Sequence, residues 1–197
     1  MSATISDHGA AESKRHVRTE ARAARRSLGL EERDRLSRAI TARVLAMPEV
    51  AAAGMLLVYA ALPEEVDTAT LISVLADRGV VIAVPRVCGD REMTLHRIGS
   101  LDELVPGACD IPEPTGDTEA MPPEAFDVVV VPGVAFDRGC RRVGFGGGFY
   151  DTLLPRLRLG AFTIGLAFDE QLVDEVPCEE HDRPLDAVVT PTALHRR

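Results

Sequence analysis

Short runs of apolar residues alternate along the chain with stretches in which apolar positions recur at helical spacing. Buried strands are predicted at Met55–Ala61, Val80–Pro85, Asp127–Val131, Phe162–Phe168 and Ala187–Thr190, and a short strand at Met93–Ile98. Helices are predicted at Ser13–Leu28, from Gly29 to Pro48, at Thr68–Arg78 and at Phe149–Leu157, the last interrupted by Pro155. Apolar strands that alternate with helices indicate an α/β domain, whose largely parallel sheet is covered on both faces.

The length of the chain and the breaks in this pattern indicate one domain. A chain of 197 residues, 46% of them hydrophobic, is long enough to bury a substantial core. Residues 1–12 are small and polar and are predicted to form a disordered tail, which leaves residues 13–197 as the single domain. The acidic, Pro-rich stretch Pro106–Glu124 is expected to be a long surface loop rather than a linker.

Charge is distributed unevenly along the chain. The net charge of −9 argues against nucleic-acid binding by the surface as a whole. Lys14–Arg43 nevertheless holds ten Lys and Arg against four Asp and Glu, so this segment would attract an anionic ligand. Lys14 is the only lysine beside 21 arginines. It is therefore a candidate for a task that needs a compact ammonium group, and chance is the simpler explanation when this fact is taken alone.

The cysteines and the apolar runs bear on where the protein is located. The four cysteines, Cys88, Cys109, Cys140 and Cys178, are widely spaced and form no C-x-x-C pair. Because no apolar signal segment stands at the N-terminus, they are expected to be reduced thiols in the cytoplasm. The longest apolar runs are too short to cross a bilayer, so no membrane partner is expected.

A cluster of glycines follows the fourth predicted strand. The stretch from Arg141 to Asp151 reads RRVGFGGGFYD, with glycine at four of the five positions from Gly144 to Gly148. Glycine costs backbone entropy on folding, so such a cluster indicates that something must approach the backbone closely. Between a strand and a helix of an α/β sheet, successive N–H groups suit a phosphate. The cluster matches neither the P-loop nor the G-x-G-x-x-G pattern, and a flexible turn is the alternative.

Charged neighbours add to the phosphate interpretation. Arg142 offers a planar fork for phosphate oxygens. Asp151 is either a Mg²⁺ ligand or only a favourable residue at the start of a helix. Lys14, Arg18 and Arg22 are spaced four positions apart and so share one helical face. That face is either solvated, or its pair Lys14 and Arg18 forms a clamp on the same polyphosphate.

Several motifs together resemble the 5-formyltetrahydrofolate cyclo-ligase family, also called methenyltetrahydrofolate synthetases. They are KRHVR near the N-terminus, LPEEVDT after the first strand, AVPR after the second, DRGCRRVGFGGGFYD, and the closing EEHDRPLDAVVTP. The resemblance runs from Lys14 to Thr190 in the family's order, and its glycine block is highly specific. It implies a three-layer α/β/α, Rossmann-like fold. It also implies the Mg²⁺- and ATP-dependent conversion of 5-formyltetrahydrofolate to 5,10-methenyltetrahydrofolate, with release of ADP and phosphate.

The resemblance implies roles for individual residues. Lys14 and Arg142 are expected to be catalytic. ATP is expected to contact Lys14, Arg18, Arg142, Val143, Gly144, Phe145, Gly146, Gly147, Gly148, Phe149 and Tyr150. The folate, with or without a polyglutamate tail, is expected to contact Ala60, Glu65, Phe145, Gly146, Gly147, Gly148 and Phe149. Asp151 and Asp182 are expected to bind Mg²⁺.

The chain departs from the family's usual residues within the glycine block. Val143 replaces a usual Leu, and Phe149 replaces a usual Tyr, which loses a hydroxyl group but keeps a ring. Neither change removes a charged group that the chemistry needs. The expected partners are ATP and the folate, bound by a monomer without nucleic acid or membrane.

The inventory of residues suits phosphoryl transfer. If the formyl oxygen takes the γ-phosphoryl group of ATP, it becomes a good leaving group and N10 can close the ring. Such a transfer needs positioning and charge neutralisation more than a protein nucleophile. His181 is either a base or a residue that shapes the metal loop. The rings of Phe149 and Tyr150 either stack on a flat ligand or belong to the core.

Two other classes of function stay open at this point. A non-catalytic nucleotide- or anion-binding module would keep the glycine loop without needing Asp151 or Asp182. A sugar-phosphate isomerase or a CoA-transferase on a similar α/β scaffold would bind phosphate but ignore ATP, because fold alone does not fix function.

Overall fold

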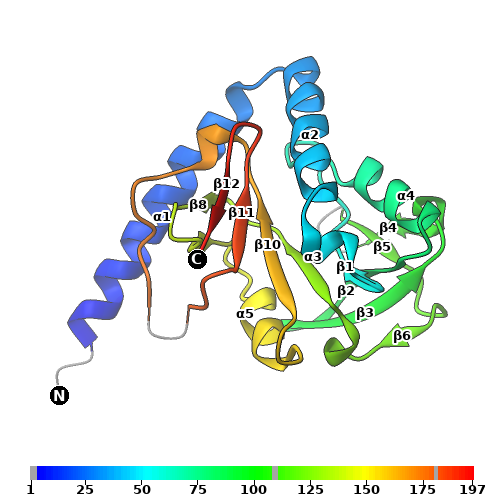
Figure 1. Cartoon of the computed structure of the whole chain (residues 1–197). Helices are drawn as coiled ribbons and strands as arrows, with labels where there is room; N and C mark the ends of the chain where they lie inside the picture. Colours follow the sequence, from blue (N-terminus) through cyan, green and yellow to red (C-terminus); the bar gives the residue numbers. More distant parts are fainter. Residues whose placement is uncertain (1–3, 108–110, 180–181) are drawn as a thin grey trace.

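An eight-stranded sheet organises the molecule (Figure 1). The computed structural model describes the backbone of residues 4–107, 111–179 and 182–197, and the side chains from Ala11 onward within these ranges. The strand order is β12-β11-β10-β7-β1-β2-β3-β6. Cys109 and His181 lie outside the described residues, so their predicted roles are not placed by the structure.

The centre of the sheet is parallel, as the apolar runs predict. It consists of β1 (Met55–Leu57), β2 (Val81–Gly89), β7 (Val128–Val131), β10 (Phe162–Leu166) and β11 (Ala187–Val189). The antiparallel strands are β3 (Glu92–Ile98), β6 (Ala120–Met121) and β12 (Leu194–Arg196). All four valines of β7 are buried, because helices and loops cover both faces of the sheet at this strand.

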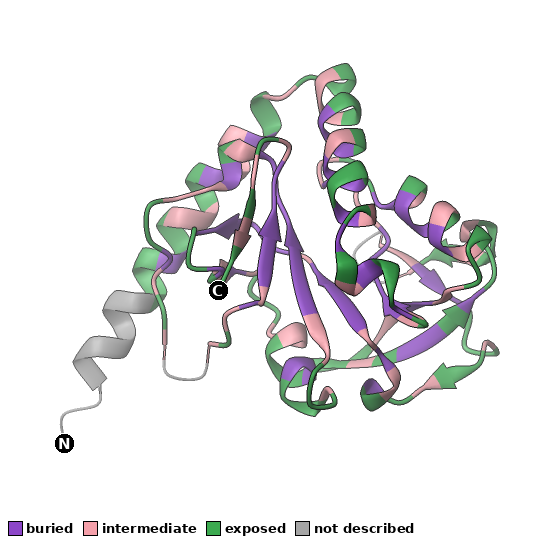
Figure 2. Ribbon diagram, viewed as in Figure 1, coloured by how far each residue is buried: buried purple, intermediate pink, exposed green. Residues whose placement is uncertain are grey.

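The two faces of the sheet carry separate apolar clusters. On one face, α2 (Leu30–Leu45), α3 (Pro48–Ala51) and α4 (Ala69–Asp77) pack against the strands. The other face is covered by α5 (Phe149–Leu153) and by connecting segments that carry the fully buried rings of Phe126, before β7, and Phe136, after it. Figure 2 shows the buried centre between exposed helix surfaces. The α/β fold with layers on both faces of a largely parallel sheet is confirmed.

Helix α1 (Thr4–Ser27) stands apart from these layers at one end of the sheet (Figure 1). It packs through Ala21 and Val17 against a small second sheet of β8 (Ala135–Phe136) and β9 (Arg142–Val143). The helix begins nine residues earlier than predicted, so the expected disordered tail is helical from Thr4 onward. Residues 4–12 contain no proline and include two alanines, so nothing in them stops the helix from extending towards the N-terminus.

Other boundaries differ from the predicted ones for local reasons. Helix α5 ends at Leu153 and continues as a 3₁₀ turn over Leu154–Arg156, because Pro155 lacks the N–H that an α-helix needs. The predicted surface loop contains β5 (Pro112–Pro114), which pairs with β4 (Leu104–Pro106), and β6. Further 3₁₀ turns span Leu101–Glu103, Pro123–Ala125 and Asp169–Gln171.

The topology brings several chain segments to one edge of the sheet. The parallel strands β1, β2 and β7 end side by side, and ligands of open α/β sheets bind at such an edge. The loop between β9 and α5, which is the glycine-rich Gly144–Gly148, lies there too. None of the helices in the described part of the chain is both long and apolar enough for a membrane span.

Candidate active site

A pocket of about 920 Å³ opens at this edge of the sheet. Its walls come from α1, the segment after β1, the β2–β3 hairpin, the glycine loop and the segment before β11. Every residue that the sequence assigned to ATP, the folate or Mg²⁺ lines this one pocket. Positions as distant in the chain as Lys14, Glu65 and Asp182 therefore meet at one site.

The glycine loop has a defined conformation that other residues could not adopt freely. Gly146 has φ +105° and Gly148 has φ +71°, both in the region that side chains disfavour. A Cβ on Gly147 would lie 2.6 Å from the ring of Phe149. Among the described residues, the N–H groups of Gly146, Gly147 and Gly148 make no hydrogen bond. Within the described ranges, the loop thus presents unpaired N–H donors, and its φ values require glycine at two positions.

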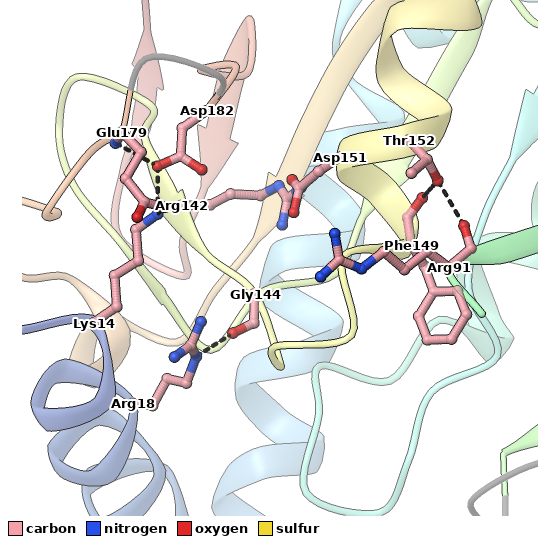
Figure 3. A network of polar contacts seen from close by, with 10 residues as sticks. All are labelled: Lys14, Arg18, Arg91, Arg142, Gly144, Phe149, Asp151, Thr152, Glu179 and Asp182. Atoms are coloured by element: carbon pink, nitrogen blue, oxygen red, sulfur yellow. Dashed lines mark hydrogen bonds and ion pairs between the residues drawn. The ribbon is translucent and has the colours of Figure 1, made fainter. Parts of the chain in front are cut away.

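Helix α1 holds the loop in place through its basic face. Arg18 Nε donates a 2.8 Å hydrogen bond to the carbonyl oxygen of Gly144 (Figure 3). The Phe145 ring lies beneath two guanidinium groups, with Arg22 at 5.6 Å and Arg25 at 5.8 Å from its centroid. These cation–π contacts and the hydrogen bond attach the loop to α1. The basic face of α1 therefore faces the glycine loop rather than bulk solvent.

Lys14 is buried between two carboxylates of the C-terminal segment (Figure 3). Its Nζ donates a 2.6 Å hydrogen bond to Asp182 Oδ2 and another hydrogen bond to Glu179. The backbone N–H of Glu179 also donates to Asp182 Oδ2, at 2.8 Å. Burial lowers the pKa of Lys14, but the hydrogen bonds that Lys14 donates to Asp182 and Glu179, together with their negative charges, outweigh it, so the pKa is raised and the ammonium is kept charged.

Arg142 and Asp151 form a second internal ion pair next to the glycine loop. The Arg142 side chain is only 7% exposed, and its Nε is buried without a hydrogen-bond partner among the described residues. Such an orphaned donor in a pocket wall suits an incoming acceptor oxygen. The pKa of Arg18 is lowered by burial and by the neighbouring charge of Arg22, although its guanidinium stays protonated because arginine is ordinarily charged far above neutral pH.

The donor set fits a magnesium ion that arrives with a nucleotide. Asp151 and Asp182 both line the pocket, and Mg²⁺ is commonly held by one or two carboxylates together with water and substrate phosphates. No group of three or more His, Cys, Asp or Glu suited to a metal occurs within the described ranges. The site is therefore suited to a metal that shares its coordination with a ligand, rather than to a metal held by protein alone.

Two of the residues expected to contact the folate, Ala60 and Glu65, line the pocket from the segment after β1, and the others belong to the glycine loop and to Phe149. Glu65 Oε2 accepts a 2.9 Å hydrogen bond from the N–H of Leu62, and burial raises the pKa of this carboxyl group. Phe149 lines the pocket, whereas Tyr150 packs against the second apolar cluster and reaches the pocket only in part. The buried Tyr150 hydroxyl has no partner among the described residues. Tyr150 therefore belongs in part to the core, and stacking of a ligand on Phe149 stays a prediction.

Sequence reasoning missed three charged residues of the site, which are Arg91, Glu179 and the buried Glu113, a carboxylate that accepts a 3.2 Å hydrogen bond from the N–H of Val87. Glu179 stands in the quoted closing motif but received no role, because nothing in the sequence predicts its contact with Lys14. Arg91 also lines the pocket, from the turn between β2 and β3. The apolar pocket residues Pro85, Val87, Met93 and Ile111 were not predicted either, since their alternation looks like that of any buried strand.

Known proteins resemble the chain over nearly its whole length. Residues 10–191 match the 5-formyltetrahydrofolate cyclo-ligase family. The chain is 34% identical over 174 residues to the 5-formyltetrahydrofolate cyclo-ligase of Escherichia coli K12, covering 86% of this chain and 96% of that protein. It is 30% identical over 192 residues to the mouse (Mus musculus) 5-formyltetrahydrofolate cyclo-ligase, covering 89% of this chain and 92% of that protein.

Solved structures agree with the sequence comparison. The NMR structure of Aquifex aeolicus 5,10-methenyltetrahydrofolate synthetase matches with a TM-score of 0.82 and 33% identity, covering 93% of this chain and 92% of that one. A Mycoplasma pneumoniae 5,10-methenyltetrahydrofolate synthetase, 22% identical with a TM-score of 0.74, covers 90% of this chain and 98% of that one and supports the fold. The fold and the site thus define an α/β protein of the methenyltetrahydrofolate synthetase type. The chain belongs to the 5-formyltetrahydrofolate cyclo-ligase family, which confirms the resemblance seen in the sequence.

Proposed function

We propose that the chain converts 5-formyltetrahydrofolate to 5,10-methenyltetrahydrofolate with ATP, and releases ADP and phosphate. The observation that carries this proposal is the convergence on one pocket of every residue that the resemblance assigns to ATP, the folate or Mg²⁺. The pocket has a cationic end with free N–H donors and a more apolar end. It could therefore bind a polyphosphate and a flat pterin next to each other.

The polyphosphate end is formed by α1 and the glycine loop. Lys14, Arg18 and Arg142 supply three cations, and the unpaired N–H groups of the loop supply neutral donors. In phosphoryl transfer, such donors act by positioning the chain of phosphates and neutralising its charge. We assign ATP binding to this end, with Lys14 and Arg142 next to the transferred group.

The reaction needs one transfer and one ring closure. The γ-phosphoryl group passes from ATP to the formyl oxygen of the folate, which releases ADP and creates a phosphate leaving group on the formyl carbon. N10 then attacks that carbon, the C–O bond breaks with release of phosphate, and N10 loses its proton. The apolar walls at Tyr59, Met93 and Phe149 limit the access of water to this reactive intermediate.

Asp151 and Asp182 are the residues that would hold Mg²⁺ in this scheme. Bound magnesium would neutralise the charge of the ATP phosphates. For the carboxylate oxygens that form these ion pairs to bind Mg²⁺ instead, the pair of Asp182 with Lys14 and the pair of Asp151 with Arg142 must break. Lys14 and Arg142 are then available to phosphate oxygens. The ion pairs thus keep the cations close to the phosphate site and the carboxylates close to the metal site.

The cellular setting remains a proposal. The described cysteines Cys88, Cys140 and Cys178 are free thiols, which suits the reducing cytoplasm predicted from the sequence. The monomeric state and the acceptance of polyglutamylated folates stay predictions.

The test is the formation of methenyltetrahydrofolate, followed by its absorbance, when the protein is mixed with 5-formyltetrahydrofolate and MgATP. We expect product only with ATP, and release of one phosphate for each product molecule. ATP binding without turnover would indicate a non-catalytic module. Turnover of a sugar phosphate or a CoA ester without ATP would indicate the other alternative class.

A further inference from the structure

Arg91 occupies a backbone conformation that arginine rarely adopts. It stands in the two-residue turn between β2 and β3, where Gly89 pairs with Glu92, and its φ is +58°. Glycine and asparagine are the usual residues at such a position, because a Cβ in the left-handed region costs about 1–2 kcal/mol. A residue held in this region despite its side chain points to a task for that side chain.

The turn is fastened to the glycine loop and to α5. The Thr152 hydroxyl shares its one proton between two acceptors, the carbonyl oxygens of Arg91 at 2.7 Å and Phe149 at 2.8 Å (Figure 3). The Arg91 side chain lies on Gly148, where a Cβ would be 3.2 Å from its Cδ and 3.3 Å from its Nε. The absence of a side chain at Gly148 therefore leaves the space through which Arg91 crosses the loop.

The charge of Arg91 is unmatched within the site. Lys14 and Arg142 each pair with carboxylates, and Arg18 bonds to a carbonyl oxygen. Within the described ranges, the Arg91 guanidinium has neither an ion pair nor a side-chain hydrogen bond. An arginine that lines a pocket without a partner is available to an anion that enters it.

The position of Arg91 in the pocket indicates which part of a bound ligand it would contact. Figure 3 shows Lys14 and Arg18 on one side of the glycine loop and Arg91 on the other. The β2–β3 hairpin that carries Arg91 also supplies Val87 and Met93 to the apolar part of the pocket. Arg91 thus stands at the border between the polyphosphate end and the end proposed for the pterin.

We propose that Arg91 is a further catalytic residue, whose guanidinium binds the phosphoryl group while this group passes from ATP to the formyl oxygen. This inference rests on the proposed function. In the step concerned, the bond from the γ-phosphorus to the β–γ bridging oxygen breaks, and its electron pair stays with ADP. A bond from the formyl oxygen to the same phosphorus forms, and Arg91 donates hydrogen bonds to the equatorial oxygens without exchanging a proton.

The test separates the charge of Arg91 from its role in the turn. Arg91→Asn removes the guanidinium but keeps a residue suited to the left-handed region. We expect it to lower the single-turnover rate of methenyltetrahydrofolate formation about 100- to 1000-fold, the range for the loss of one donor to a developing charge. The KM values for ATP and the folate should change much less, and added guanidinium ion should restore part of the rate.

Two further variants control for structure. Arg91→Gly relieves the left-handed strain, so it should fold at least as well as the wild type and be as slow as Arg91→Asn. Arg97→Asn removes an exposed arginine of β3 that pairs with Glu119, and should leave the rate unchanged.

The results distinguish this inference from the proposed function. An active wild type together with a fast Arg91→Asn variant would overturn the role of Arg91 alone. So would a variant that changes only the KM for the folate, because Arg91 would then hold the substrate's own carboxylates. An inactive wild type would overturn the proposed function itself, and this inference with it.

Discussion

Lys14 and Asp182 are joined by a 2.6 Å hydrogen bond although 168 positions separate them in the chain. The first helix and the segment before β11 thus close one side of the pocket together. Because Glu179 also accepts from Lys14, the cation proposed for ATP is already neutralised before any ligand enters. This relationship changes what substitutions at the site are expected to do.

Replacing Lys14 removes a cation and also leaves two carboxylates unpaired. We expect Lys14→Ala to raise the KM for ATP about 10- to 150-fold, corresponding to roughly 1.5–3 kcal/mol for a charge-assisted hydrogen bond. Repulsion from Glu179 and Asp182 should add to this loss. Initial rates at varied ATP measure it.

The control is Arg15→Ala, the neighbouring exposed cation of α1. It removes the same formal charge and should leave the KM for ATP unchanged. If the KM for ATP of the Lys14→Ala variant equals that of the wild type, the assignment of Lys14 to the nucleotide is contradicted.

A side chain at Gly147 should disrupt the loop. A Cβ there would lie 2.6 Å from the Phe149 ring, which must then move from the pocket wall. We expect Gly147→Val to abolish turnover with little loss of secondary structure by far-UV circular dichroism. Gly29→Val makes the same replacement where nothing lies within 4 Å, and should remain active. A Gly147→Val variant with near-normal kcat/KM would mean that the loop is not the phosphate site.

The two aspartates proposed for magnesium should act as one unit. We expect Asp151→Asn and Asp182→Asn each to raise the Mg²⁺ concentration needed for half-maximal rate and to lower kcat. The double variant should lose less than the product of the two losses, because both residues act on one ion. Asp174→Asn, at an exposed position, is the matched control.

Independent effects of the two substitutions would place the aspartates in different sites. A variant that loses only thermal stability, with an unchanged Mg²⁺ requirement, would limit Asp182 to its contacts with Lys14 and the Glu179 N–H.

Glu65 should affect stability in a way that depends on pH. Burial raises its pKa above the ordinary 4.5, so the folded state favours the protonated acid. The stabilisation is fully present below the unfolded pKa and is lost as pH rises through the folded pKa. We therefore expect Glu65→Gln to raise the melting temperature at pH 8 and to have little effect below pH 4.5, as measured by thermal unfolding at several pH values.

The neighbouring Glu64 provides a control of opposite sign. The pKa of Glu64 is lowered, since hydrogen bonds from Arg26 and Arg25 outweigh its burial. Glu64→Gln should therefore reduce stability at pH 8, where Glu65→Gln increases it. Glu65→Gln should also lower kcat/KM for the folate but leave the KM for ATP unchanged. If the melting temperature depends on pH in the same way for both variants and the wild type, the buried environment described for Glu65 is contradicted.

Apolar runs predicted the central sheet well, because burial on both faces leaves a strong local signal. The run after Asp127 became β7 almost to the residue. The edge strand β12 and the β8–β9 pair were missed, since short, partly exposed strands are set by their neighbours rather than by their own sequence. Motifs predicted which residues form the site. They did not predict that Arg142 pairs with Asp151, because such pairs depend on packing between distant segments.

The charges that line the pocket also affect how fast a nucleotide associates with it. Three cations around the glycine loop face three carboxylates: Lys14, Arg18 and Arg142 against Asp151, Glu179 and Asp182. With the other charged residues of the pocket counted, four cations (Arg91 included) stand against five carboxylates (Glu65 and Glu113 included), so the pocket exerts little attraction on an anion at long range. Capture of the nucleotide should therefore proceed by ordinary diffusion, at a rate that changes little with ionic strength. Specific recognition begins only at contact, when the cations turn from the carboxylates to the phosphates and the carboxylates bind the metal.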